Sequence, residues 1–132
     1  MAGPVVHDPA PTLRAPSFGT ASAKDLPAFL GVMQVLHSEP TASAYGRLLV
    51  GETEGSDVAG LVHVFEEIST LAIHGLISED LLFDAFALDL YYDQLNDQVD
   101  DIRKRSGNAK FAENFEVAAG LARSYRTQRP RK

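Results

Sequence analysis

The first residues to consider for chemistry are a histidine and two glutamates in one predicted helix, His63, Glu66 and Glu67. Helical bundles hold di-iron sites with Glu residues and with Glu-x-x-His pairs, in which the histidine follows the glutamate by three residues. Positions 69 and 70 are serine and threonine, so this spacing is not met. We therefore expect no metal. His63 and Glu67, one helical turn apart, remain the best-spaced metal candidates. Asp84, Asp89 and Asp93 could supply oxygen ligands, but they are expected to face away from the apolar seam over residues 81–102.

The residue types on which most enzymes depend are missing or misplaced. The 132 residues contain no cysteine, which excludes disulfides, thiol nucleophiles and thiolate metal sites. No Gly-x-Ser-x-Gly motif is present. Gly51 and Gly55 flank an acidic Glu-Thr-Glu segment that would repel a phosphate. We expect no catalytic residue and no cofactor.

Basic residues gather in the last third of the chain. Three basic and 16 acidic residues precede Arg103, whereas nine basic and two acidic residues follow from there on. The two parts could neutralise each other in the fold, or the basic part could bind an anionic partner such as a nucleic acid or an acidic membrane surface. The anion-binding candidates are Arg103, Lys104, Arg105, Lys110, Arg123, Arg126, Arg129, Arg131 and Lys132.

The helices that would position these side chains follow from hydrophobic periodicity. We expect an all-α domain, an antiparallel bundle of four to five helices, over residues 22–126. A proline- and alanine-rich arm over residues 1–21 and a basic tail over residues 127–132 are predicted to be disordered. The predicted helices span residues 24–37, 40–50, 56–74, 79–105 and 108–126.

Two of these segments carry the prediction of the bundle. Residues 56–74 have an apolar stripe wide enough for a central helix. Residues 79–105 carry a heptad-like seam that packs within the chain or against a second copy. Leu26, Phe29, Leu30, Met33 and Leu36 form the apolar face of the first helix. The stripe is Val58, Leu61, Val62, Phe65, Ile68 and Ala72, and the seam is Leu81, Ala85, Leu88, Tyr92, Leu95, Val99 and Ile102.

Residues 61–122 resemble a group of small helical bacterial domains of unknown function. In that group a helix ends in a Gly-Leu-Ile-type turn, and a long helix with paired aromatic residues ends in an arginine. The matching segments are Val64 to Ile68, Ile73 to Phe83, Tyr91-Tyr92, Ile102-Arg103 and Phe111 to Glu116. Many members carry an N-terminal membrane helix, where this chain has a proline-rich arm. The resemblance implies no activity, and it implies that Arg103 is a polar anchor.

These observations favour a non-enzymatic protein-interaction or regulatory module. No stretch approaches the roughly 20 apolar residues that span a bilayer. Without a signal peptide or cysteines, the chain is expected in the cytoplasm. The expected partner is a protein, with a homodimer as one possibility and an anionic partner as the alternative.

Overall fold

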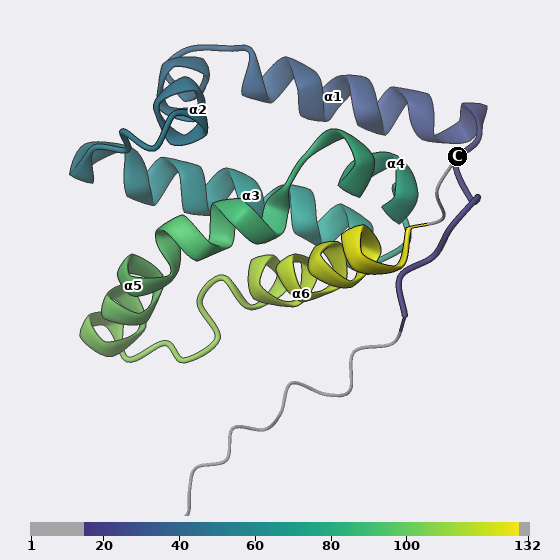
Figure 1. The fold of residues 1–132 in the computed structure, drawn as a ribbon. Helices are drawn as coiled ribbons and strands as arrows, with labels where there is room; N and C mark the ends of the chain where they lie inside the picture. Colours follow the sequence, from purple (N-terminus) through teal and green to yellow (C-terminus); the bar gives the residue numbers. More distant parts are fainter. Residues whose placement is uncertain (1–14, 130–132) are drawn as a thin grey trace, which may run out of the picture.

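The computed structural model describes residues 15–129, and in this range the chain is all-helical, as predicted. Six α-helices and two short 3-10 helices are present, and the described residues contain no strand (Figure 1). The α-helices are α1 (Leu26–Leu36), α2 (Thr41–Leu49), α3 (Val58–Ile73), α4 (Glu79–Ala85), α5 (Leu88–Ser106) and α6 (Glu113–Gln128). The 3-10 helices η1 (Ala23–Asp25) and η2 (Gly55–Asp57) lead into α1 and α3.

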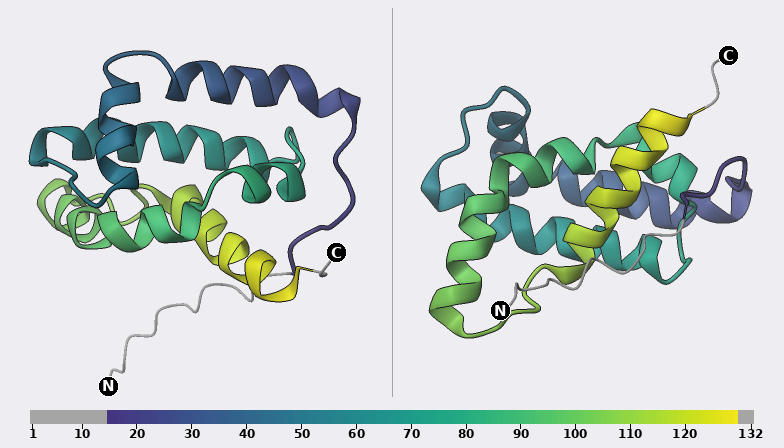
Figure 2. Two further views of the ribbon diagram at one scale, coloured as in Figure 1. Left: turned by 45° about the horizontal axis from the view of Figure 1, so that its top comes forward. Right: turned by 60° about the horizontal axis from the view of Figure 1, so that its bottom comes forward.

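Helix α3 lies at the centre of the fold, with α1 and α2 toward one side and α5 and α6 toward the other (Figures 1 and 2). All six residues of its predicted apolar stripe are buried. Phe65 is completely buried in an aromatic cluster with Tyr91 and Phe115, whose ring centroids lie 5.2 and 5.3 Å from its own. The cluster joins α3 to α5 and α6, and Tyr45 extends it to α2.

The predicted single helix over residues 79–105 is wrong, because the chain breaks between α4 and α5 at Phe86 and Ala87. Phe86 has extended backbone angles, φ −132° and ψ 129°. In a continuous helix, Leu82 and Phe83 would point about 120–140° away from Leu88 around the axis. The break allows all three side chains to be buried, at 0%, 3% and 0% exposure.

The heptad-like seam therefore holds only in α5. Leu88, Leu95 and Val99 are completely buried within the chain, whereas Ala85 is exposed. No second copy is needed to cover the α5 part of this seam, so the seam does not supply a dimer interface.

A glycine with a left-handed backbone conformation follows two of the helices. Gly75, after α3, and Gly107, after α5, both have φ of +72°, a left-handed conformation that residues with a side chain rarely adopt. Beside the first of these ends, Leu76 is 64% exposed and Ile77 is buried.

Helix α6 begins later than residue 108 because residues 109–112 form turns. The carboxylate of Glu66 accepts a hydrogen bond of 2.9 Å from the amide of Phe115, in the first turn of α6. Glu66 on α3 thus satisfies one of the amides that a helix N-terminus leaves without a partner.

Residues 15–22, which we call the strap, contact the helices, although residues 15–21 were predicted to belong to a disordered arm. The ring of Phe18 stacks on Tyr125 of α6 at 5.1 Å, and the amide and hydroxyl of Thr20 bond to Asp80 of α4. The strap runs from the start of α1 to the end of α6 (Figure 2). Thr127 and Gln128, expected in the tail, belong to α6. Residues 1–14 of the predicted arm and residues 130–132 of the predicted tail lie outside the described residues.

Candidate functional site

The two metal candidates pair with each other on the surface. His63 Nε2 lies 3.4 Å from Glu67 Oε2, and both side chains are exposed. Glu66 is engaged elsewhere, at the start of α6. Among residues 15–129, no group of three or more possible His, Asp or Glu ligands comes together. The arrangement is that of an exposed i, i+4 pair.

The aspartates proposed as additional oxygen ligands instead pair with α6. Arg129 lies 2.6 Å from Asp84 and Arg123 lies 2.8 Å from Asp93. Between these pairs, Arg126 contacts Asp89. The later the aspartate stands in the sequence of α4 and α5, the earlier its arginine stands in α6 and the residue that follows it. The two stretches of chain therefore run in opposite directions. We call these three ion pairs the arginine ladder.

Asp89 was expected on a solvated face opposite the seam, and this is wrong, since its side chain is completely buried. One oxygen meets Arg126, and the other, Oδ1, has no hydrogen-bond partner in the described part of the chain. A buried carboxylate is costly unless it is paired, so Arg126 is needed at this position.

The predicted anion-binding residues do not form one patch. Besides the arginine ladder, Arg103 pairs with Glu116 at 2.9 Å and Arg105 pairs with Asp101 at 2.9 Å. Lys104 and Lys110 form no ion pair with any residue that the structure describes, whereas Arg131 and Lys132 fall outside its range. Five of the nine candidates therefore have their charges compensated by carboxylates of the same chain.

Arg103 also joins α5 to the turn that precedes α6. Its Nε atom donates a hydrogen bond of 2.8 Å to the carbonyl of Phe111, and its side chain is only 18% exposed. The guanidinium thus fixes the approach of α6, and it is not free to bind a phosphate.

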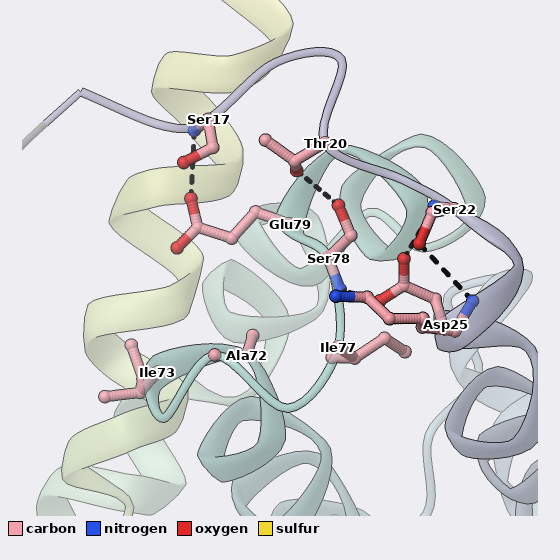
Figure 3. Close-up of a pocket in the computed structure, with 11 residues that line it drawn as sticks. Ser17, Thr20, Ser22, Asp25, Ala72, Ile73, Ile77, Ser78 and Glu79 are labelled. Carbon is pink, nitrogen blue, oxygen red and sulfur yellow. Dashed lines mark hydrogen bonds between the residues drawn. The ribbon is translucent and has the colours of Figure 1, made fainter.

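A hollow of about 310 Å³ lies between the strap, the start of α1 and the turn that leads into α4 (Figure 3). Its polar groups face one another. The amide of Ser17 donates to Glu79 at 3.0 Å, and Asp25 accepts hydrogen bonds of 2.8 Å from the amides of Ser22 and Ser78. These carboxylates hold the strap and the turn together, so the polarity of the hollow has a structural explanation.

The least expected surface is the outer face of α1. The eleven residues of α1 contain no charged side chain. Leu26 is 53% exposed and Leu30 is 51% exposed, although both were expected on the face that packs. Leu36, expected on the same face, is buried, and so is Val32. The outer face of α1 is defined here as Leu26, Pro27, Leu30, Gly31, Gln34 and Val35, all of which are exposed.

This surface could have been recognised in the sequence from the missing charges. A surface helix of a globular protein normally carries charged or polar residues opposite its apolar stripe. In α1 only Gln34 is polar. The spacing of the apolar residues alone could not show which side of such a helix faces water.

Comparison with known proteins adds a family but no activity. A family model described as "Domain of unknown function (DUF4760)" matches residues 34–120. The chain belongs to this family. The resemblance to a small uncharacterised domain family is thus confirmed. None of the curated proteins and none of the solved structures that were compared matches the chain.

The DUF4760 match leaves out parts of the surfaces described above. It begins in the last turn of α1 and ends within α6, so the strap, Leu26, Leu30 and the arginines of the ladder lie outside it. Within the described range, no helix of this DUF4760 chain is long and apolar enough to cross a bilayer.

Proposed function

We propose that this chain is a non-enzymatic protein-interaction module, active in the cytoplasm, and that the outer face of α1 is its docking surface. The proposal depends on one observation, a helix without a charged residue whose apolar side chains remain half-exposed. The helical bundle would hold this face in a fixed orientation.

Part of the apolar surface of α1 is still in contact with water. Apolar surface gains about 25 cal/mol for each Å² removed from water. Leu26 and Leu30 lie one turn apart, and each keeps about half of its surface exposed. Single exposed leucines are ordinary, but an uncharged row of them is typical of surfaces that a partner covers.

The alternative, an anionic partner bound by the basic residues, has less support. The arginine ladder, Arg103 and Arg105 already contact carboxylates, and separating these pairs would offset the gain from a phosphate. Of the described basic candidates, Lys104 and Lys110 remain available to bind an anionic partner. Binding to duplex DNA and to anionic vesicles should be undetectable at about 150 mM salt, where weak phosphate binding is largely screened.

The proposed function is tested by site-specific photo-crosslinking in the native host. In one variant a photoreactive amino acid replaces Leu30. In the control it replaces Gln98, an exposed residue of α5. We expect one dominant crosslinked species from position 30, which Leu26→Asp removes, and none from position 98. Equal, diffuse labelling from both positions would show that the outer face of α1 is not a docking surface.

A further inference from the structure

We infer that the strap opens as a unit while the six α-helices stay folded, and that the negative charge of Asp80, at the start of α4, keeps it closed. Two features of the strap lead to this conclusion. Its hydrogen bonds converge on carboxylates, and it supplies almost none of the hydrophobic core. Because its contacts are with α4 and α6, its opening is separate from the docking surface proposed on α1.

The carboxylate of Asp80 is the main acceptor for the strap. One oxygen accepts a hydrogen bond of 3.1 Å from the amide of Thr20, and the other accepts one of 3.1 Å from its hydroxyl. The amide of Gly19 and the hydroxyl of Ser78 also donate to this carboxylate. An ionised carboxylate accepts on both oxygens, whereas protonation turns one of them into a donor. Loss of the charge therefore removes part of the attachment of the strap.

Hydrogen bonds, and not a cation, stabilise the charge of Asp80. Burial alone would raise its pKa, but the bonds from Ser78, Thr20 and Gly19 together outweigh burial, so the pKa lies below its ordinary 3.8. No cation of the described chain contributes to this pKa. Because the pKa is lowered in the closed state, the contribution of Asp80 to closure is full above about pH 4 and is lost as the pH falls below that value.

The other titratable and charged groups around the strap come from η1, α4 and α6. The strap itself carries no charged side chain, and the α3 residues that line the hollow are apolar. Glu79 accepts a hydrogen bond of 3.0 Å from the amide of Ser17, so a second carboxylate holds the strap. An acid titration protonates both carboxylates, and only a substitution separates them. The groups are Lys24, Asp25, Glu79, Asp84, Tyr125 and Arg129.

The strap contributes little to the hydrophobic core. Pro16 is its one buried residue, and none of its residues belongs to the core cluster. The ring of Phe18 is 36% exposed although it stacks on Tyr125. Tyr125 also packs edge-on against Phe83 at 5.9 Å, which keeps its ring in place when Phe18 leaves. Segments with few buried apolar contacts open locally while the rest of the protein remains folded.

The opening segment ends at Ser22, which caps η1. Its hydroxyl accepts a hydrogen bond of 3.3 Å from the amide of Lys24, and its amide donates one of 2.8 Å to Asp25. Asp25 also accepts a bond of 2.8 Å from the amide of Ser78, so η1 stays attached to the turn before α4. Residues 15–21 can therefore move without α1. Their departure would uncover Tyr125 and one side of the hollow (Figure 3).

A fluorescent reporter in the strap tests the opening. The chain contains no tryptophan, so Phe18→Trp introduces a single one at the position that stacks on Tyr125. Acrylamide quenching of its fluorescence measures the accessibility of the strap, and circular dichroism follows the helices. As the pH is lowered from 7, quenching should rise before the helical signal falls. Adding Asp80→Asn should make quenching high already at pH 7, with the helical signal unchanged. Adding Asp101→Asn, at an exposed position of α5, should change neither.

Hydrogen exchange at pH 7, followed by mass spectrometry, tests the same opening in the chain without tryptophan. Asp80→Asn should accelerate exchange of the strap peptide about tenfold, because hydrogen bonds to a charged group are lost. Thr20→Val leaves α4 untouched, removes one neutral donor and should accelerate it about threefold. Peptides of α3 and α6 should exchange as before.

Three results would overturn the inference. The first is a strap peptide whose exchange Asp80→Asn does not accelerate. The second is equal acceleration of α3, which would mean that Asp80 supports the whole fold. The third is quenching and helical signal that change together as the pH is lowered.

Discussion

The carboxyl group of Asp57 is held in its charged form by its neighbours. Two nitrogens of the Arg47 guanidinium, Nε and one terminal nitrogen, each donate a hydrogen bond of 2.7 Å to its carboxylate, and the amide of Glu54 adds a third bond of 3.0 Å. The bonds from Arg47, followed by the bond from Glu54, lower the pKa of Asp57 to about 2 from its ordinary 3.8. The pair joins the end of α2 to the start of α3.

This pKa gives a prediction for acid stability. Because the folded-state pKa lies below the unfolded value, the contribution of Asp57 is fully present above pH 4 and is lost as the pH falls toward 2. Asp57→Asn should lower the free energy of unfolding at pH 7 and reduce its decline between pH 4 and 2. Urea denaturation at several pH values measures both effects. The exposed Asp101→Asn serves as the control, and parallel curves for Asp57→Asn and the original protein would contradict the prediction.

The arginine ladder allows a second comparison of single residues. Arg126 is the partner of the completely buried Asp89, whereas Arg123 and Asp93 are both half-exposed. Arg126→Met leaves a buried carboxylate unpaired and should cost about 3 kcal/mol, while Arg123→Met should cost less than about 1 kcal/mol. Thermal or urea unfolding of the two variants measures the difference. Equal losses would mean that Asp89 reaches water.

At the scale of elements, the break between α4 and α5 decides which side chains support the core. Leu82 is completely buried in α4, whereas Leu81, which a continuous helix would place on the seam, is half-buried. Leu82→Ala should cost about 2–5 kcal/mol, and Leu81→Ala less than about half of that. Urea denaturation of the two variants checks this ranking. The opposite order would support a single continuous helix over residues 79–105.

The helix positions could mostly be predicted from the sequence, but the break could not. The apolar residues of α3 recur at helical spacing, and Gly75 follows shortly after the helix, so the limits of α3 follow from local signals. Phe86 and Ala87 carry no such signal, because neither is a proline or a glycine. The chain breaks there because two apolar groups cannot both face the core from one straight helix, and the seam spacing concealed this.

For the molecule as a whole, stability depends on the contact of α3, α5 and α6 around Phe65. Its ring packs against aromatic rings from α2, α5 and α6. Phe65→Ala should destabilise the fold by about 3–5 kcal/mol, measured by urea denaturation. Phe18→Ala, which removes a half-exposed ring from the strap, should cost less. A loss under about 0.5 kcal/mol at Phe65 would show that the core is assigned wrongly.

At this scale, the contacts that could not be predicted are those between residues distant in the sequence. Asp89 meets Arg126 and Thr20 meets Asp80, and no local pattern indicates either partner. The charge asymmetry did suggest that the acidic and basic parts could neutralise each other, and the arginine ladder is that arrangement. Which basic residues remained for a ligand could be decided only from the tertiary structure.

The strap has a practical consequence. Because Phe18 stacks on Tyr125, the strap lies beside the last turn of α6. A short linker could therefore join residue 15 to residue 129 after removal of the flanking segments. New termini could then open in the exposed turn at Glu52, so that circular permutation should yield a folded protein in which the strap has become an internal loop.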